Sequence, residues 1–425
     1  MEHALIETYG CTLNQADSDM IEGILRQEGV QTERGIHSDE ADADYVIINT
    51  CTVKKPTEQK ILDRIQKMNG KGDKLIVTGC MASANPDRIR KAAPKARIIS
   101  INNMPEMLPK LLNGNPDTNM FAYKRMDRSK FIYNPTGVIA RIPISDGCLS
   151  SCSFCETKFA RGPLNSFSEE LILKAVSNAV SKGAKEIELA SQDTGAYGAD
   201  KKTDIAYLVS KAADISGNFR IRIGMLNPEH LHKYLDRLIE CYKSDKVYKF
   251  LHLPVQSGSD SVLKDMKRNY SADEFRTYIG EIREKIPGIS IATDMIVGYP
   301  TETEEDFEMS INMLNDIRPA VTNVSKFWER PNATAKRSGR LSNATIKERS
   351  IRMARLAKAI QYEDLSMAIS TTEKVCVTES NQKSNIARDS FYRNIALKDK
   401  EELGSEITVR ITGNSSVCLL AERYS

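Results

Sequence analysis

The chain has 425 residues, which is too long for one ordinary hydrophobic core, so we expect two to four domains. Its 40% hydrophobic and 28% charged residues are typical of a soluble globular protein, and a net charge of +3 is too small to argue for nucleic-acid binding by itself. The N-terminus lacks the pattern of a secretory signal, and no stretch approaches the roughly 18 to 20 apolar residues of a membrane span, so no membrane association is expected.

Residues 1–112 alternate strand and helix signals. Three short apolar runs, HALIETYG, YVIINTC and KLIVTGC, are separated by amphipathic stretches such as SDMIEGILRQEG. This rhythm predicts an N-terminal domain built on an open parallel α/β sheet. Cys11, Cys51 and Cys80 each lie at or just after the carboxyl end of one of these runs. Because ligands bind at that edge of a parallel sheet, the three thiols could converge there.

Residues 113–137 show no periodicity and are predicted to be a linker, and a longer alternating region follows over residues 138–365. Its six candidate strands are ARIPIS, EIELASQD, FRIRIGML, FLHLPVQ, SIATDMIVG and VTNVSKFW. Helical segments such as SEELILKAVSNAVSKG lie between them. Six such units predict an incomplete parallel (β/α)6 barrel with its chemistry at the carboxyl ends of the strands, and the fold class is α/β.

The end of the chain changes character twice. Between Arg330 and Lys358 there are nine Lys or Arg and one acidic residue, Glu348, and the second half of this segment is predicted to be helical. Residues 367–425 contain four β-rich runs, EKVCVTES, NIALKD, SEITVRITG and VCLLAERYS, which are enough for a small antiparallel β-barrel. This last module carries eight basic and eight acidic residues, so it is not plainly basic.

The cysteines carry the strongest chemical signal. Nine cysteines without a regular pairing pattern do not suggest a secreted disulfide scaffold, so we expect a cytoplasmic protein with reduced or metal-bound thiols. Cys148, Cys152 and Cys155 form a C-x3-C-x2-C loop after a predicted strand. Three thiolates on a four-iron cluster leave one iron open, and S-adenosylmethionine could chelate it. A zinc site with a borrowed fourth ligand and three unrelated cysteines are the alternatives.

This loop and the partial barrel resemble the radical S-adenosylmethionine superfamily. The segments YGCTLNQADSDMI, INTCTVKKPTEQK and VTGCMA resemble the N-terminal domain of the methylthiotransferases, and the last segment is similar to their RNA-binding β-barrel, called TRAM. The stretch CSFCETKFARGPLNSFS looks most like the archaeal and eukaryotic branch of that family. That branch converts N6-threonylcarbamoyladenosine at tRNA position 37 to its 2-methylthio derivative.

The resemblance implies two [4Fe-4S] clusters. Cys148, Cys152 and Cys155 would hold the catalytic cluster that cleaves S-adenosylmethionine, and the N-terminal triplet of cysteines would hold a second cluster that carries or supplies sulfur. One S-adenosylmethionine would donate a methyl group, and another would give the 5′-deoxyadenosyl radical that removes hydrogen from an unactivated carbon. The implied partners are tRNA, an electron donor and a sulfur source, and we expect a monomer.

Further site residues are predicted from their places in the loop and at strand ends. Lys158 and Arg161 follow the cluster loop and could meet the carboxylate of the cofactor or of the substrate. The predicted cofactor-binding residues are Phe154, Gln192, Asp193, Gln256, Ser257, Asp294 and Gly298. For each strand-end residue a turn or capping role is an equal alternative.

Two other functions stay open from the sequence. The same chemistry could act on an aspartate of a ribosomal protein, or the chain could be a non-catalytic iron–sulfur protein that binds RNA or senses redox state. RNA binding is supported by basic residues in the linker (Lys124, Arg125, Arg128 and Lys130) and by the segment from Arg330 to Lys358. The alternative for such charge runs is a solvated helix face.

Overall fold

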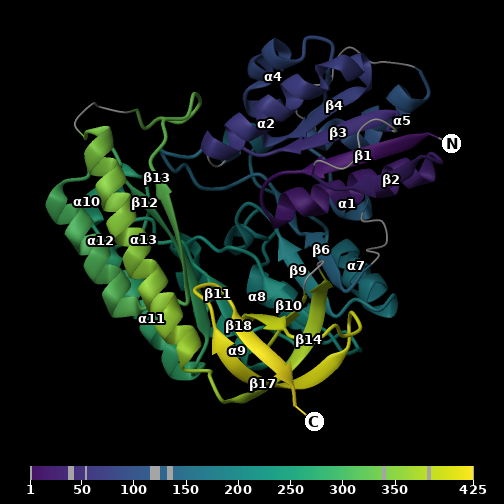
Figure 1. The fold of residues 1–425 in the computed structure, drawn as a ribbon. Coiled ribbons are helices and arrows are strands. Elements are labelled where there is room, and N and C mark those ends of the chain that lie inside the picture. The colour runs from purple at the N-terminus through teal and green to yellow at the C-terminus, as the bar shows by residue number, and fades with distance from the viewer. Residues whose placement is uncertain are drawn as a thin grey trace.

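The computed structural model describes residues 2–36, 43–52, 55–114, 125–131, 137–336, 341–380 and 384–424. Figure 1 shows an N-terminal α/β body (purple to blue), a central α/β body (teal to green) and a small β-barrel (yellow) on the opposite side of the central body. This confirms the predicted fold class. The domain limits 1–112, 113–137, 138–365 and 367–425 are kept as proposals.

The N-terminal body is a five-stranded parallel sheet in the order β2-β1-β3-β4-β5. The three predicted strands are its centre, and their apolar side chains are buried on both faces because helices cover the sheet. The two edge strands, β2 and β5, were not predicted, because they are short and carry polar residues. The elements are β1 (His3–Thr8), α1 (Thr12–Gln27), β2 (Gln31–Arg34), β3 (Tyr45–Thr50), α2 (Lys55–Lys67), η2 (Met68–Lys74), β4 (Leu75–Gly79), α3 (Cys80–Ala84), α4 (Pro86–Ala92), β5 (Arg97–Ile98), η3 (Ile101–Asn103) and α5 (Met104–Leu112).

The central body contains the six predicted parallel strands, which pair as β6-β9-β10 and β11-β12-β13. Backbone hydrogen bonds join the two groups: the Tyr248 N–H donates to Ile221 O at 3.0 Å, and the Leu226 N–H donates to His252 O at 2.9 Å. The strands are β6 (Ile139–Pro143), β9 (Glu186–Ala190), β10 (Arg220–Ile223), β11 (Phe250–His252), β12 (Ser290–Val297) and β13 (Val321–Lys326). The result is an open, six-stranded partial barrel, as the spacing of the apolar runs predicts.

Helices cover the outside of this partial barrel, and the largest hydrophobic core lies between them and the strands. A short antiparallel pair that was not predicted, β7 (Ser145–Asp146) with β8 (Asn165–Ser166), closes the two ends of the cysteine loop. The helices are η4 (Arg128–Phe131), α6 (Thr157–Arg161), α7 (Glu169–Ser181), η5 (Thr194–Ala196), α8 (Ile205–Ala213), η6 (Pro228–Lys233), α9 (Leu235–Lys243), α10 (Asp260–Asp265), α11 (Ala272–Lys285), α12 (Glu304–Ile317) and α13 (Asn343–Ser366).

The C-terminal module is a closed five-stranded barrel in the order β14-β15-β16-β18-β17. Its strands are β14 (Thr372–Ser380), β15 (Asn385–Arg388), β16 (Asn394–Leu397), β17 (Glu406–Asn414) and β18 (Leu419–Arg423), of which β15 was not predicted. The predicted antiparallel barrel is confirmed in four of its five pairings, and the fifth, between β16 and β18, is parallel. A closed ring with an odd number of strands must contain at least one parallel pair.

This barrel docks against the amino end of the central strands. The Tyr392 hydroxyl, between β15 and β16, donates to Glu188 Oε1 at 2.9 Å and to Glu186 Oε1 at 3.2 Å, and both acceptors lie on β9. The Tyr392 ring packs 5.0 Å from the rings of both Tyr248 and Phe250. The carboxyl ends of the strands, where chemistry is expected, therefore lie at the other end of the central body.

Several basic residues counted as RNA-binding candidates are engaged inside the protein. Arg128 is buried between Asp17 and Asp146, and Arg349 donates to Glu302 Oε1 at 2.6 Å. Arg330 is buried against Glu58. Lys124 lies outside the described residues. Among the residues that the structure describes, no helix is long and apolar enough to cross a membrane.

Candidate metal and cofactor centre

The N-terminal cysteines follow three neighbouring strands of one sheet. Cys11 follows β1, Cys51 follows β3 and Cys80 follows β4, and these strands are adjacent and parallel. The order 2-1-3-4-5 changes direction between β1 and β3, and ligands of such sheets bind at that point. The chain that carries Cys11 lies against Cys51, because a Cβ added to Gly10 would lie 3.0 Å from the Cys51 Cβ. Crowding by protein atoms raises the pKa of Cys11, and the neighbouring Cys80 raises it further.

A buried amide organises this edge of the sheet. Asn14 Nδ2 donates to Thr50 O at 2.9 Å, and the Cys11 thiol donates to Asn14 Oδ1 at 3.3 Å. Gly79, directly before Cys80, has a φ of 87°, and a Cβ there would lie 2.4 Å from the Thr50 carbonyl oxygen. Only glycine suits this left-handed, crowded position. Backbone geometry and one amide thus bring the three thiols to a common edge.

The second triplet lies on a loop at the carboxyl end of β6. Gly147 turns the chain with a φ of 71°, and a Cβ there would lie 2.1 Å from the Pro163 carbonyl oxygen. The Thr157 N–H donates to Cys155 Sγ at 3.3 Å, and Arg268 Nη1 donates to Cys152 Sγ at 3.3 Å. Burial, and then the charge of Asp193, raise the pKa of the Cys148 thiol above its usual value. The turn at Gly147 fixes the start of the loop, and the hydrogen bonds from Thr157 and Arg268 fix the positions of Cys155 and Cys152.

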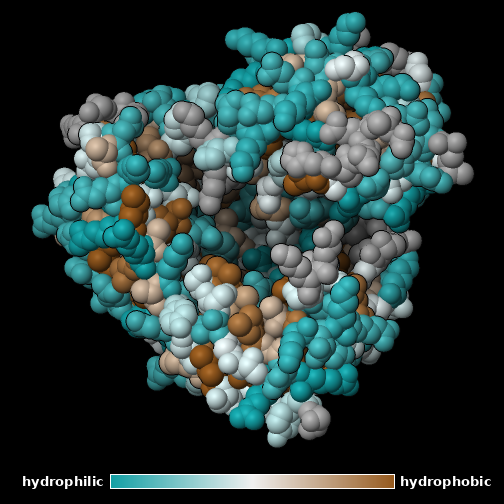
Figure 2. Space-filling view, viewed as in Figure 1, coloured by the Kyte–Doolittle hydropathy of each residue, from teal (hydrophilic) through white to brown (hydrophobic). Residues whose placement is uncertain are grey.

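The segments that carry the two triplets are in contact across the boundary between the first two bodies. Helix α3, which begins at Cys80, packs against α6, which begins two residues after Cys155. Arg161, at the end of α6, donates from Nε to Cys80 Sγ at 3.3 Å. On the other side, the Thr52 hydroxyl donates to Glu156 Oε2 at 3.2 Å. Figure 2 shows a hollow between the upper N-terminal body and the rest of the molecule.

Each triplet offers three thiols, and thiolates are the usual protein ligands of iron–sulfur clusters. Within the described ranges, no three His, Cys, Asp or Glu side chains lie close enough together to hold one metal ion. A mononuclear zinc site would draw its thiolates to about 2.3 Å from a common centre, whereas a cluster binds each thiolate at a different iron and so spaces them farther apart. Three thiols in each set, with arginine donors to Cys80 and Cys152, match the usual surroundings of such clusters.

Two of the predicted cofactor residues present unpaired acceptors. Asp193 Oδ1 accepts the N–H groups of Gly195 at 3.0 Å and Asn227 at 2.9 Å, so this residue is also a cap of η5. Its Oδ2 is buried without a hydrogen-bond partner, although His230 Nε2 lies 3.3 Å away, and Gln192 Oε1 is likewise buried and unpaired. Acceptors left in this state at the carboxyl end of β9 suit a ligand that brings its own donors.

The remaining predicted cofactor residues have structural partners. Gln256 has a φ of 75°, a strained conformation for a non-glycine residue, and its N–H donates to Asp294 O at 2.8 Å. Asp294 Oδ1 is 3.1 Å from His252 Nε2. Ser257 Oγ accepts the Ser259 N–H at 3.2 Å, so a turn role accounts for it.

Phe154 and Gly298 lie on the same side of the central body. Phe154 packs on a small cluster of buried residues that includes Met266 and Tyr299. Gly298 has a φ of 78°, and its N–H donates to Glu302 Oε2 at 3.1 Å. For Gly298 a backbone role is sufficient.

Lys158 and Arg161 differ in exposure. Lys158 is exposed and donates to Leu149 O at 3.2 Å. Arg161 is 1% exposed and its Nη2 donates to Asp17 Oδ2 at 2.7 Å. This buried ion pair favours a role inside the protein over the predicted contact of Arg161 with a substrate carboxylate.

Sequence reasoning missed the residues that support the cysteines. Arg268, Asn14, Asp17 and Glu156 were not singled out as site residues, because the partners shown here lie far away in the chain. One signal was available for two of them, since Asn14 and Asp17 fall inside YGCTLNQADSDMI, three and six residues after Cys11. That spacing places them in the first two turns of the helix that follows the cysteine.

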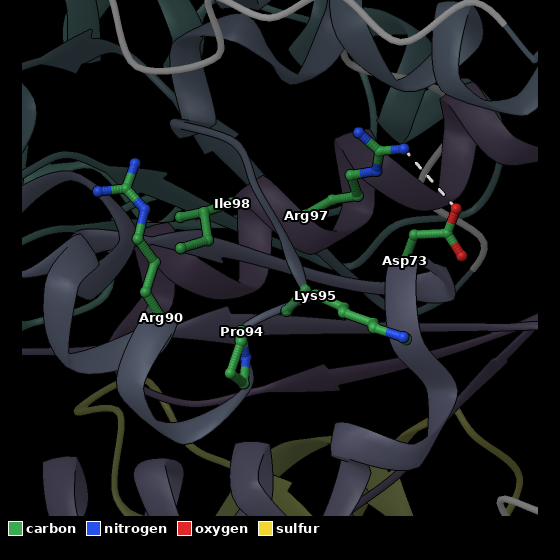
Figure 3. A pocket seen from close by; sticks show the side chains of 8 residues that line it. Asp73, Arg90, Pro94, Lys95, Arg97 and Ile98 are labelled. Atoms are coloured by element: carbon green, nitrogen blue, oxygen red, sulfur yellow. Dashed lines mark ion pairs between the residues drawn. The ribbon is translucent and has the colours of Figure 1, made fainter.

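A separate cavity of about 630 Å³ lies far from these cysteines in the N-terminal sheet. Figure 3 shows Lys95, Arg97 and Asp73 around it, and Arg97 begins β5. The cavity is therefore at the amino edge of the sheet, whereas the cysteines follow the carboxyl ends. Its largely exposed ion pair, Arg97 with Asp73 at 3.7 Å, offers no chemistry for the centre described above.

Two family models match the chain. Residues 3–100 match "Uncharacterized protein family UPF0004", and residues 142–314 match the Radical SAM superfamily. The first match contains Cys11, Cys51 and Cys80, and the second contains the C-x3-C-x2-C loop.

Curated relatives match over nearly the full length. A protein of Methanothermobacter thermautotrophicus named "Probable threonylcarbamoyladenosine tRNA methylthiotransferase" is 39% identical, with 98% of each chain covered. A protein of Pyrococcus horikoshii with the same name is 37% identical, with 99% of each chain covered. The mouse protein named "Threonylcarbamoyladenosine tRNA methylthiotransferase" is 31% identical over 96% of this chain and 71% of its own length.

Solved structures share the fold at low identity. The radical S-adenosylmethionine methyltransferase TsrM from Kitasatospora setae, solved with cobalamin and a [4Fe-4S] cluster, superposes with a TM-score of 0.57 at 12% identity and covers 79% of this chain and 77% of its own. The cobalamin-dependent radical enzyme OxsB gives a TM-score of 0.56 at 12% identity over 85% of this chain and 56% of its own. At these identities the similarity concerns the fold alone.

Proposed function

The chain belongs to the threonylcarbamoyladenosine tRNA methylthiotransferase family, and we propose on this basis that it converts N6-threonylcarbamoyladenosine at tRNA position 37, next to the anticodon, to the 2-methylthio derivative. The enzyme is a radical SAM tRNA methylthiotransferase. The observation that supports the proposal is the packing of α3, which begins at Cys80, against α6, which follows the C-x3-C-x2-C loop, because it joins the two matched family regions beside their cysteines. The names of the full-length relatives favour tRNA over a ribosomal aspartate and over a non-catalytic protein.

Membership of the radical SAM superfamily implies S-adenosylmethionine and a [4Fe-4S] cluster. We assign this cluster to Cys148, Cys152 and Cys155, and we propose a second [4Fe-4S] cluster on Cys11, Cys51 and Cys80. When bound, these groups supply the electron, the carbon radical, the sulfur and the methyl group that an unactivated aromatic C–H requires. No side-chain base could substitute, because such a C–H has no useful acidity at neutral pH.

The side chains around the loop would bind and orient the cofactor. Asp193 Oδ2, which lies near His230 Nε2, and Gln192 Oε1 accept no hydrogen bond in the structure, and both suit ribose hydroxyls or an ammonium group. Phe154 offers an aromatic face beside the last cysteine of the loop. Gln256 follows β11, and Asp294 lies within β12 and not at its end, as the sequence had suggested. A backbone hydrogen bond joins the two residues, and both are kept as cofactor residues. Ser257 and Gly298 are kept for the shape of the backbone that follows Gln256 and β12.

Exposed residues beside the same loop suit the substrate. Leu149 is 44% exposed and Phe159 is 60% exposed, and Lys158, which precedes Phe159 in the chain, donates to the Leu149 carbonyl. Proteins read unstacked RNA bases with apolar or aromatic faces and their phosphates or carboxylates with Lys and Arg. We therefore keep Lys158 as a substrate residue, contacting the threonyl carboxylate or a neighbouring phosphate.

The remaining partners follow from the chemistry. A cluster that cleaves S-adenosylmethionine needs an electron donor, and each methylthio product consumes one sulfur, so a separate donor and a sulfur source are required. We propose that the protein is a cytoplasmic monomer that meets tRNA, this donor and this source there.

The direct test is nucleoside mass spectrometry of tRNA from cells that lack the protein. We expect the 2-methylthio derivative to disappear while N6-threonylcarbamoyladenosine persists, and the wild-type gene to restore it. A copy with Cys152→Ala should fail to restore it, and a copy with Cys241→Ala, whose thiol is buried away from the loop, should succeed. Unchanged 2-methylthio levels in the deleted strain would contradict the proposal.

A further inference from the structure

Four charged side chains are buried where the N-terminal body meets the cluster loop. Asp17 and Asp146 are 0% exposed, and Arg128 and Arg161 are 1% exposed. Arg128 contacts both carboxylates, and Arg161 Nη2 donates to Asp17 Oδ2 at 2.7 Å. The four formal charges sum to zero, so each charge is compensated within the group. Arg128 alone would already give both aspartates a cation.

Arg161 reaches beyond this group to a thiol. Its Nε donates to Cys80 Sγ at 3.3 Å, and its Nη1 is buried without a hydrogen-bond partner, with Asp146 Oδ1 3.9 Å away. An arginine required only for the ion pair would not need this second interaction. Among the donors of this guanidinium it is therefore Nε that is directed at the thiol, while Nη1 is a buried donor on the side of Asp146.

The position of Arg161 along the chain is also constrained. It ends helix α6, which begins two residues after Cys155, and α6 packs against the helix that begins at Cys80. A rigid helical turn therefore links the last ligand of one predicted cluster to a donor on a ligand of the other.

We propose that Arg161 is a positioning residue for the second cluster, the one held by Cys11, Cys51 and Cys80. It fixes Cys80 relative to the loop that carries Cys148, Cys152 and Cys155. Its positive charge stabilises the reduced form of the second cluster. This inference rests on the second cluster of the proposed function. Reduction adds one negative charge to a cluster, and a nearby cation or hydrogen-bond donor lowers the free energy of the more negative state. The carboxylate of Asp17, in contact with Arg161, acts in the opposite direction.

The test uses the full chain with Cys148, Cys152 and Cys155 replaced by Ala, so that only the second cluster can form. After anaerobic reconstitution, iron per chain is measured and the cluster is titrated with reductant under electron paramagnetic resonance. Arg161→Gln is expected to lower the midpoint potential so that the reduced-to-oxidised ratio at a fixed potential falls about tenfold, which is about 59 mV for one electron. Arg161→Lys, which keeps the charge, should recover part of the shift.

Asp17→Asn is the matched control, because it breaks the same ion pair at the same boundary and preserves shape. The charge model predicts a shift of opposite sign, to a higher potential. Shifts of the same sign in both variants, or no shift in Arg161→Gln, would overturn the inference and leave Arg161 a structural residue. If Arg161→Gln does not fold, the midpoint potentials of Arg161→Lys and Asp17→Asn are compared with that of the parent protein. An unchanged midpoint potential in both variants would overturn the inference. Failure of the triple-Ala parent to bind iron is a different result, which refutes the second cluster itself.

Discussion

Arg268 supports the loop that carries Cys148, Cys152 and Cys155, although it lies 116 residues after Cys152 in the chain. Its guanidinium donates to Cys152 Sγ at 3.3 Å, to Pro254 O at 2.9 Å and to the Tyr270 hydroxyl at 2.8 Å, and it is 9% exposed. Residues of this kind orient metal ligands, and their removal commonly costs about 10- to 100-fold in metal affinity or activity. We therefore expect Arg268→Met to slow formation of 5′-deoxyadenosine by about that factor, as measured by chromatography of single-turnover reactions.

The control for this experiment is Arg276→Met, which removes an exposed ion pair on α11 and should leave the rate unchanged. Arg268→Met should also retain the iron bound by the N-terminal cysteines. A normal rate in Arg268→Met, or an equal loss of rate in Arg276→Met, would show that the hydrogen bond to Cys152 has no special part in holding the loop.

At the scale of residues, the sequence predicts the cysteine ligands better than the residues that hydrogen-bond to them. The cysteines are visible because their spacing is chemically unusual, whereas Arg268 and Arg161 act through interactions that only the fold creates. Arg161 illustrates the limit. Its place behind the loop suggested a substrate contact, and only the buried carboxylate of Asp17 shows that its charge is already engaged.

Among the elements, the cysteine loop depends on one glycine. A Cβ at Gly147 would lie 2.1 Å from the Pro163 carbonyl oxygen, and the backbone φ of 71° is unfavourable for any other residue. Gly147→Ala should therefore displace the loop and reduce iron binding by the second triplet of cysteines. Iron analysis and circular dichroism of the reconstituted protein measure this reduction against retention of the fold.

Gly280→Ala on α11 provides the comparison, because a Cβ there meets nothing within 4 Å. In a helix this change should stabilise the protein by up to about 1 kcal/mol and leave iron binding intact. Equal iron binding in Gly147→Ala and the wild type would refute the requirement for a left-handed residue before Cys148.

The interface between the C-terminal barrel and β9 should respond to pH. Burial, and then the charge of Glu188, raise the pKa of Glu186 from 4.5 to about 7. Between these values the folded protein holds a proton that the unfolded chain has released, so the free energy of unfolding falls as the pH rises through this window. The group contributes at most about 3 kcal/mol at 1.36 kcal/mol per pKa unit, and less because the pair is coupled.

Glu186→Gln removes this titration while keeping an acceptor for the hydroxyl of Tyr392 or Tyr248. Relative to the wild type, the melting temperature of the variant should rise between pH 5.5 and pH 8. Thermal unfolding of both proteins across this range measures the difference. A constant difference at all pH values would show that Glu186 titrates normally in the folded protein.

At the scale of elements, the strands were predicted wherever an apolar run is long. The six central strands and the three inner N-terminal strands came from such runs. The missed strands have only two to four residues, and polar residues are among them; they are β2, β5, β7, β8 and β15. The parallel pairing of β16 with β18 could not be inferred from strand patterns, since it follows from closure of a five-stranded ring.

At the scale of the whole molecule, the two ends of the central strands differ in what lies against them. The C-terminal barrel covers the amino end of the strands, and the cysteines lie at the carboxyl end. A tRNA held only by that barrel would be far from the chemistry, so the exposed basic residues of α13 are candidates to extend the binding surface. Figure 1 shows α13 running along the outside of the central body from the level of the N-terminal body to the barrel.

We expect the triple variant Lys347→Gln, Arg355→Gln and Lys358→Gln to weaken tRNA binding and to reduce its salt dependence. All three side chains are exposed on α13. Each lysine or arginine that no longer neutralises a phosphate lowers the slope of log affinity against log salt by about one unit. Filter binding at several salt concentrations measures both quantities.

The same number of charges removed elsewhere is the control. Lys174, Lys211 and Lys264 are exposed on α7, α8 and α10, and their replacement by Gln should change affinity less and leave the slope nearer to the wild-type value. Equal decreases in affinity for the two triple variants would show that the binding depends on net charge and not on the face formed by α13.

The order of the three bodies was predictable from the sequence, but the interfaces between them were not. The basic count between Arg330 and Lys358 includes Arg330 and Arg349, which are buried in ion pairs within the protein. A count of charges treats every Lys and Arg alike. Only the packing distinguishes the basic residues that form buried ion pairs from the basic residues that are exposed to solvent.

We propose above that one chain holds two four-iron clusters, each bound by three cysteines. Iron analysis with Mössbauer spectroscopy of the anaerobically reconstituted protein tests it most directly. We expect about eight irons per chain, all in [4Fe-4S] clusters, and about four after either triplet is replaced by Ala. Four irons or fewer in the wild type, or zinc bound by either triplet, would contradict it.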